Sequence, residues 1–296
     1  MIVREKPTVA DLFTALRGSV LPQIWRALLA LVLLTVLLVL LDHWLKVLPH
    51  LEGTAVTVFG IGLSLFLGFR NNAAYDRWWE ARKLWGGLLA DLRAFAREVE
   101  VFVPDVALRH AMLRQSLGFL HAHRMSLRKM TADPAAPAET QAVLHDPLPA
   151  CAAMDRLNAM LAEAYRAGTV DGYGARSLTA RLGQISLQQA GCERIANSPL
   201  PFVYSLLIYR TTYLYCLLLP LVLAGPAGWM TPLIVGIVAY VFLGLAEVTE
   251  ELSHPFATTA NGLPLSAICR AAEISLAPHL GEVPPAPLKP VDYYLS

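Results

Sequence analysis

The sequence predicts an all-α membrane protein with four transmembrane helices and a helical region on the cytosolic side. Of its 296 residues, 55% are hydrophobic and only 16% are charged, and the mean hydropathy is +0.47. This composition is too apolar for an ordinary soluble enzyme. Four apolar runs are long enough to cross a bilayer. The segment between the second and third runs has apolar residues at helical spacing and shows no alternating strand pattern.

The first apolar run covers residues 27–41, between Arg26 and Asp42. With its amphipathic edges it reaches about 20 residues, the length that crosses a hydrocarbon core of roughly 30 Å. Trp25 and Trp44 stand where interfacial anchors are expected. The second run covers residues 53–69 and carries no charge.

The third run begins near residue 199, and the fourth covers residues 229–246. Only Pro-Ala-Gly at 226–228 separates the two runs, so we expect a tight antiparallel hairpin. Arg210 interrupts the third run. Because a charge inside a membrane is costly and usually faces a partner or water, we expect a structural ion pair at Arg210. The candidate partners at the end of the fourth run are Glu247, Glu250 and Glu251.

The distribution of Lys and Arg predicts the orientation of the chain. Four basic residues precede the first span, one separates the first two spans, six closely follow the second, and none separates the last two. The positive-inside rule therefore places both termini in the cytosol. The expected segments are a cytosolic N-terminal segment (1–25), two spans (26–70), a cytosolic helical region (71–198), two further spans (199–250), and a cytosolic helix with a Pro-rich tail (251–296).

The second span carries two stripes at i, i+4, i+8 spacing. The small stripe is Gly60, Ser64 and Gly68, and the bulky stripe is Ile61, Leu65 and Phe69. Small residues let membrane helices approach closely. In a ring of identical subunits, the bulky stripe can face the axis and form a constriction that gates by dewetting. The alternative, which the spacing alone favours, is that both stripes pack inside the bundle of one subunit. Arg70 then begins a polar stretch that a solvated membrane edge explains.

No catalytic or metal-binding constellation stands out, so we expect neither an enzyme nor a cofactor. The sequence has no GxSxG, P-loop or GxGxxG motif. His121 and His123 are two residues apart, a spacing that splays side chains on a helix. Glu251 and His254 have the Glu-x-x-His spacing of carboxylate metal sites, but this pattern occurs once and predicts no metal. A net charge of +1 gives no general attraction to nucleic acid.

Three segments resemble the bacterial branch of the bestrophin family of ion channels. They are "FLGFRNNAAYDRWWEARKLWG", "AGCERIANSPLPFVYSLLIYRTTYLY" and "EELSHPF…GLPLSAICRAAEISL", and they occur in order over most of the chain. The resemblance implies a homopentamer around one axial pore in the bacterial inner membrane, with the lipid bilayer and permeant monovalent ions as its other partners.

The resemblance also implies particular pore residues. The family has a neck of apolar rings on the second span, and the matching positions are Ile61, Leu65 and Phe69. It has a second constriction at the cytosolic exit, which aligns near Tyr173. Animal members hold calcium with an acidic cluster, whereas residues 257–263 contain no carboxylate. Hard cations need several oxygen ligands, so we do not expect calcium activation here.

The resulting hypothesis is a passive channel for monovalent ions. The likeness to the bacterial branch favours cations, with an anion-selective channel as the alternative. A secondary transporter would show internal repeats or broken helix pairs, and a membrane-anchored enzyme or scaffold that works through catalysis would show a catalytic cluster. Neither pattern is evident in the sequence.

Overall fold

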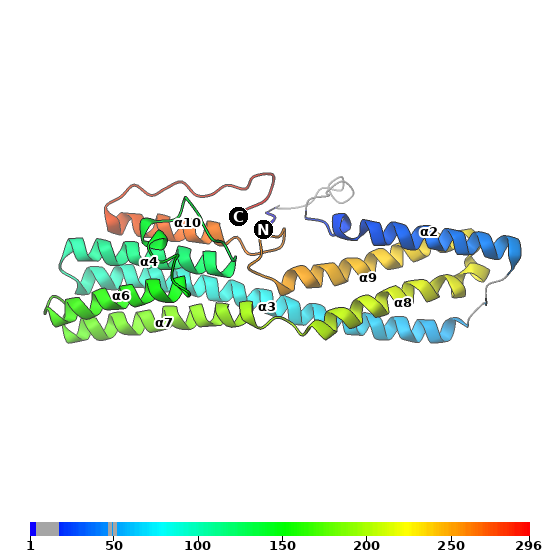
Figure 1. The fold of residues 1–296 in the computed structure, drawn as a ribbon, viewed down its shortest axis with the longest axis horizontal. Coiled ribbons are helices and arrows are strands. Elements are labelled where there is room, and N and C mark those ends of the chain that lie inside the picture. The colour runs from blue at the N-terminus through cyan, green and yellow to red at the C-terminus, as the bar shows by residue number, and fades with distance from the viewer. Residues whose placement is uncertain (4–17, 47–48, 50–51) are drawn as a thin grey trace. The chain divides into compact units, whose positions relative to one another are not determined.

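The computed structural model describes residues 1–3, 18–46, 49 and 52–296 (Figure 1). Residues 4–17, which contain three of the basic residues that orient the chain, lie outside the described residues, as do 47–48 and 50–51. The chain forms two compact units. The apolar unit consists of the described residues between 18 and 78, together with Pro199–His254. The polar unit consists of residues 1–3, Trp79–Ser198 and Pro255–Ser296. Among the described residues all secondary-structure elements are helices, apart from isolated β-bridges, which confirms the all-α class.

Helix α3 (Gly53–Phe102) is a single helix of 50 residues that begins in the apolar unit and ends in the polar unit. No Pro interrupts it, so the second span and the charged stretch that follows it form one element. Its buried positions recur at steps of three and four residues, which places them on one face. They include Val56, Gly60, Leu63, Leu67, Arg70, Ala74, Ala81, Trp85, Leu88, Leu92 and Val99.

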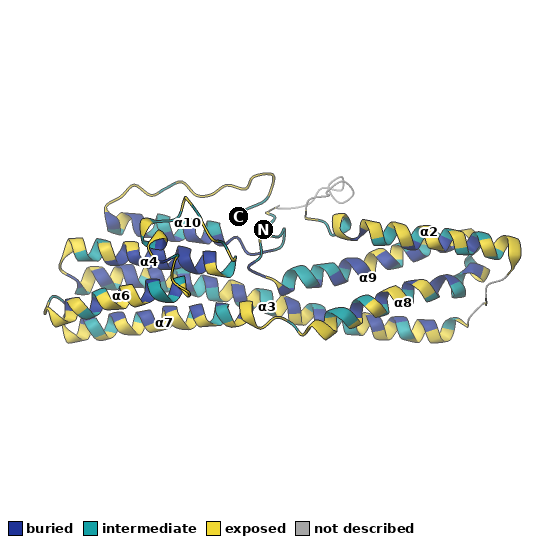
Figure 2. Cartoon of the chain, viewed as in Figure 1, coloured by how far each residue is buried: buried dark blue, intermediate teal, exposed yellow. Residues whose placement is uncertain are grey.

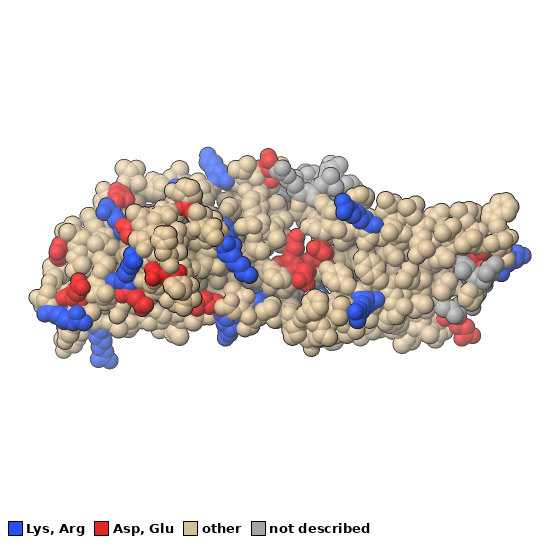
Figure 3. All heavy atoms as spheres, in the orientation of Figure 1, with Lys and Arg blue, Asp and Glu red and all other residues tan. Residues whose placement is uncertain are grey.

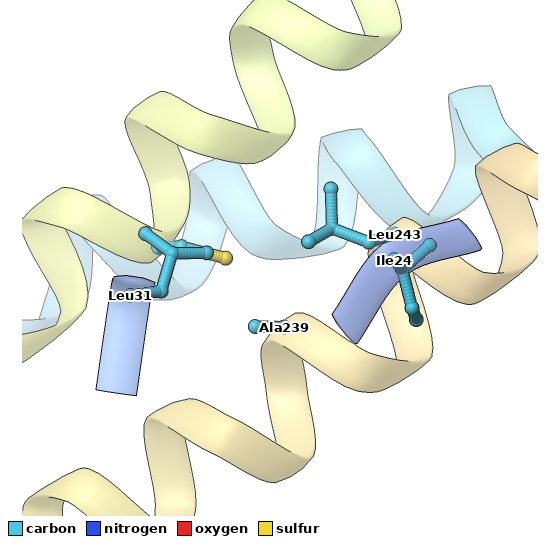
Figure 4. Close-up of a cluster of buried hydrophobic side chains, with 5 residues drawn as sticks. Ile24, Leu31, Ala239 and Leu243 are labelled. Atoms are coloured by element: carbon cyan, nitrogen blue, oxygen red, sulfur yellow. The ribbon is translucent and has the colours of Figure 1, made fainter. Parts of the chain in front are cut away.

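In the apolar unit, α2 (Leu21–Leu45), α8 (Phe202–Ala227) and α9 (Thr231–Ser253) join the first part of α3. The short 3-10 helix η1 (Gly228–Met230) connects α8 to α9, and Gly228 has a φ of +50°, which suits glycine. The expected tight hairpin is confirmed. Figure 4 shows one core cluster of this unit, in which Ile24 and Leu31 of α2 meet Cys216 of α8 and Ala239 and Leu243 of α9.

Three stretches are long and apolar enough to cross a membrane: Leu21–Leu45, Gly53–Phe102 and Phe202–Ser253. The third of these contains both α8 and α9. Only 22, 28 and 33% of their most apolar windows are buried within the chain. Figure 3 shows few charges over most of the surface of α2, α8 and α9 on the face in view. Lipid, or further copies of the chain, must therefore cover these helices.

The small stripe of α3 makes a close contact at one of its three positions. A Cβ atom at Gly60 would lie 2.6 Å from the Tyr215 hydroxyl oxygen, so α3 approaches α8 there because residue 60 has no side chain. A Cβ atom at Gly68 would have no neighbour within 4 Å among the described residues. Ser64 is exposed, and its hydroxyl donates to the carbonyl of Gly60 at 2.8 Å.

In the polar unit, α4 (Val106–Leu127) is the most enclosed helix, and nearly every residue from Met112 to Met125 is buried (Figure 2). The other elements of the unit are α5 (Ala138–Gln141), α6 (Pro149–Arg166), α7 (Gly172–Asn197), α10 (Leu265–Leu276) and η2 (Ala277–Leu280). Asp105 caps the start of α4 and Asp171 caps the start of α7 by accepting backbone N–H groups. The expected helices of the inner segment are therefore present.

The Pro-rich tail is extended and lies on its own polar unit. Its end pairs with the start of the chain, since the Met1 amino group donates to the carbonyl of Leu295 at 2.6 Å. The amide of Val3 donates to the carbonyl of Tyr293 at 2.8 Å. The backbone N–H of Ala267 on α10 donates to Ser296 at 2.9 Å. The first residues of the chain thus pair with its last residues, and Ser296 in turn contacts the start of α10.

His123 on α4 lies at the centre of the polar unit. Its ring stacks on Trp85 and on Phe119, with centroids 5.6 and 6.0 Å apart, and neither ring nitrogen has a hydrogen-bond partner among the described residues. Burial lowers the pKa of His123 to about 3. This histidine is therefore neutral in the folded protein and serves as a flat aromatic core residue.

We predict that His123 makes the protein less stable as the pH falls. An unfolded histidine has a pKa of about 6.5, so below that pH the unfolded chain binds a proton that the folded chain excludes. The free energy of unfolding then falls by up to about 1.4 kcal/mol per pH unit. Thermal unfolding of the full chain in detergent at pH 6.5 and 5.0 should show a smaller drop for His123→Phe. The exposed His145, replaced in His145→Asn, is the control. Equal pH dependence in wild type and His123→Phe contradicts the prediction.

Candidate functional site

The bulky stripe of α3 does not pack inside the chain. Ile61, Leu65 and Phe69 are 58, 58 and 70% exposed, whereas Leu63 and Leu67 between them are buried. The periodicity of the helix therefore turns one apolar face inward and leaves a second apolar face without a partner in the described part of the chain. The bulky stripe therefore does not pack inside the helix bundle of the described chain, which was the alternative expectation.

Beyond Phe69 the exposed surface of α3 becomes mixed, with the polar Asn72 and Asp76 beside the aromatic Tyr75 and Trp79. The exposed charged residues of this part of α3 are four basic (Arg82, Lys83, Arg93 and Arg97) and two acidic (Asp76 and Glu100). Among the fully exposed charged residues of this stretch, basic side chains therefore outnumber acidic ones.

Arg70 follows Phe69 directly and is buried, with only 4% of its side chain exposed. Its Nη2 donates to Glu250 Oε2 of α9 at 2.9 Å and to Ser205 Oγ of α8 at 2.6 Å. The arginine thus ties three helices of the apolar unit together at the level where the apolar run of α3 ends. The expectation of a solvated edge at Arg70 is wrong. The spacing Leu63, Leu67, Arg70 was the available signal, since it places Arg70 on the buried face.

Within the described part of a single chain, Arg210 does not form the expected ion pair. Arg210 is exposed, and its three candidate partners bind elsewhere. Glu250 pairs with Arg70, Glu247 accepts from the Tyr209 hydroxyl at 3.1 Å, and Glu251 accepts from Gln23 Nε2 at 3.1 Å. The physical reason is helical periodicity. Ile208 and Thr212 lie on the buried face of α8, and Arg210, midway between them, points away from it.

Of the three histidines weighed as metal ligands, His123 stacks in the core as described above, and the other two make ordinary polar contacts. His121 Nε2 lies 2.7 Å from Glu273 Oε1, and His254 Nδ1 lies 3.9 Å from Glu250 Oε1. Burial alone would raise the pKa of Glu273, but the hydrogen bond and charge of His121 lower it below its usual range. Among the described residues, no three His, Cys, Asp or Glu side chains are placed to hold a metal ion.

Tyr173 is the second residue of α7 and is 84% exposed. A Cβ atom at the adjacent Gly174 would lie 2.8 Å from Phe102 Cβ, so the start of α7 packs closely on the end of α3. The exposed tyrosine therefore stands beside the end of the helix that carries the bulky stripe at its other end.

The described chain is thus all-helical, and its longest apolar helix leaves the bulky stripe exposed. The sequence profile of the bacterial/fungal bestrophin protein family matches residues 1–278. A protein of Mesorhizobium japonicum, named as a voltage-dependent anion channel-forming protein, is 43% identical over 100% of this chain and 97% of its own length. YneE of Escherichia coli K12, which bears the same description, is 39% identical over 93% of each chain.

Solved structures agree with the sequence comparisons. The structure of a bacterial bestrophin homologue from Klebsiella pneumoniae has a TM-score of 0.81 and 32% identity, over 88% of this chain and 100% of that one. The chain belongs to the bacterial bestrophin family. It is therefore a bestrophin-type ion channel protein of a membrane and not an enzyme, as the sequence predicted.

We predict that removing one partner of the buried arginine destabilises the protein strongly. Glu250→Ala removes the charged partner of the buried Arg70 but leaves Ser205, and because Glu250 is itself 36% exposed the expected cost is about 1–3 kcal/mol. Arg210→Gln changes an exposed residue of the neighbouring helix α8 and should cost less than about 0.5 kcal/mol. Thermal midpoints of the full chain in detergent measure both. Equal midpoints for the two variants would show that the Arg70–Glu250 pair is not a structural bond.

Proposed function

We propose that this protein is a passive channel for monovalent ions in which copies of the chain surround one axial path. The observation that carries the proposal is the joint exposure of Ile61, Leu65 and Phe69 on one face of α3. Three bulky apolar residues at i, i+4, i+8 spacing form a continuous ridge about two turns long. In a single chain this ridge would face lipid, whereas around an axis the equivalent side chains form stacked apolar rings.

The proposed assembly is a homopentamer with four spans per subunit in the bacterial inner membrane and with both termini in the cytosol. Helices α8 and α9 have 26 and 23 residues, and each is long enough to cross a bilayer by itself. Together with α2 and α3 they supply four spans, an even number that keeps the termini on one side. The distribution of Lys and Arg supports the cytosolic side, and the number of five follows from the likeness to bestrophins.

In the proposed path, Ile61, Leu65 and Phe69 form a neck that offers an ion no polar group to replace its water. Such a constriction opposes conduction when it dewets and conducts when it widens and fills. Tyr173, which is exposed at the start of α7, is the proposed second constriction at the cytosolic exit. The apolar neck carries no charge, so the sign of the permeant ion has to be selected elsewhere.

We propose anions as the permeant species. Two observations support this choice: relatives named as anion channel-forming proteins, and the excess of exposed basic residues on α3 beyond the stripe. A basic surface beside a narrow path concentrates anions there. The cation preference drawn from the resemblance remains the competing prediction, since the neck itself is neutral.

Currents of purified protein in liposomes under asymmetric potassium chloride test both parts of the proposal. The reversal potential should lie near the chloride equilibrium potential. Leu65→Ala should raise the conductance several-fold, because a wider and less apolar ring wets more readily. Leu233→Ala on α9, another exposed leucine, is the matched control and should leave conductance unchanged. A reversal near the potassium potential would instead support cations, and the absence of current from all three proteins contradicts a channel.

A further inference from the structure

A pocket of about 280 Å³ opens in the apolar unit between α3 and α8. It lies where the apolar run of α3 ends and the polar residues begin. Its lining residues are Phe66, Phe69, Arg70, Ala73, Leu200 and Tyr204. Ligand pockets in proteins commonly measure roughly 300–1,000 Å³, so this one is large enough for the end of a ligand rather than for a whole large molecule.

Arg70 is the one charged residue among those that line the pocket, and only 5% of its surface is exposed. Its Nη2 holds Glu250 and Ser205. Its Nε and Nη1 have no hydrogen-bond partner among the described residues and are shielded from solvent. Buried donors of a charged group are costly when unpaired. An acceptor that enters beside Arg70 therefore gains more here than it would on an open surface.

The other lining residues are apolar or aromatic, which calls for a ligand with an apolar body and one acceptor end. Glu250 balances the arginine only in part, because its own side chain is 36% exposed and screened by water. A carboxylate supplies both the acceptor oxygens and the charge that suit a guanidinium. Leu207, about one turn after Tyr204 on α8, is exposed and continues the apolar surface away from the pocket.

We propose that this pocket binds the carboxylate end of a free long-chain fatty acid. The carboxylate accepts from Arg70, the first methylenes lie in the pocket against the paired rings of Phe66 and Tyr204, whose centroids are 6.0 Å apart, and the rest of the chain lies along α8 in the bilayer. The depth matches, because a fatty acid places its charge where the hydrocarbon core ends.

Phe69 belongs both to this pocket and to the exposed stripe of α3. A bound acyl chain therefore packs against one side of the same ring that we place in the neck. Under the proposed function, the fatty acid changes the current by restraining Phe69. This consequence rests on the proposed channel activity, whereas the binding site does not.

The test uses the full chain in phosphatidylcholine nanodiscs with a diazirine-bearing palmitic acid, and peptide mass spectrometry to locate the photo-label. The label is expected on the α3 and α8 peptides that line the pocket, with competition by excess palmitate. Ala73→Phe, which fills the pocket from an exposed position, should cut labelling about tenfold, a loss of about 1.4 kcal/mol in binding. Ala55→Phe makes the same change at another exposed alanine of α3 and should leave labelling unchanged.

Two further arms keep the outcome decisive. Leu200→Trp fills the pocket from the connection that precedes α8 and should reproduce Ala73→Phe, so a folding defect in one variant does not decide the result. A long-chain alcohol with the same diazirine should label about tenfold less, since it lacks the charge. Equal labelling by the alcohol, or labelling that survives both filled pockets, overturns the proposal.

If the wild type takes up no label and Ala73→Phe breaks the oligomer, a neighbouring copy of the chain fills the pocket. That result also overturns the proposed fatty-acid site. Specific labelling in a protein that passes no current supports the site and contradicts the channel function instead.

Discussion

The whole structure depends on the length and the two faces of α3. One face of this 50-residue helix is buried from Val56 to Val99, and it supplies core residues to both units of the chain. Trp85, Leu88 and Leu92 on that face are completely enclosed. Close packing therefore restricts which side chains these positions can accept. In the described part of the chain, nothing packs on the Ile61–Leu65–Phe69 stripe of the same helix in this way. The proposed function follows from this difference, since lipid or a neighbouring copy must cover a bulky apolar ridge that the chain itself leaves exposed, and the proposal assigns this ridge to neighbouring copies.

Arg70 marks the transition between the two halves of α3. A buried cation at this depth is tolerated because Glu250 and Ser205 reach it from α9 and α8. The same arrangement leaves two guanidinium nitrogens beside an apolar pocket, with no hydrogen-bond partner among the described residues. Arg70 thus serves both the packing of three helices and the proposed ligand site. The neighbouring Phe69 lines the same pocket and belongs to the exposed stripe.

Much of the fold could be predicted from the sequence, because apolar runs and breakers act locally. The start of α3 at Gly53 and the hairpin between α8 and α9 follow from composition and from Gly228. The partners of charged residues could not be predicted in this way. Arg210 and Arg70 both stand near the glutamates of α9, but the rotation of α3 and α8 decides which of them meets Glu250, and that rotation depends on the packing of the whole unit. The family resemblance, and not periodicity, singled out Tyr173.

The central claim is that copies of this chain cover the Ile61–Leu65–Phe69 stripe around a shared axis. Native mass spectrometry of the purified full chain, released from detergent micelles, tests it most directly. The account predicts a species of five times the chain mass of 32.4 kDa, with no stable smaller assembly. A protein that remains a monomer would leave the stripe without a neighbour and would contradict the claim.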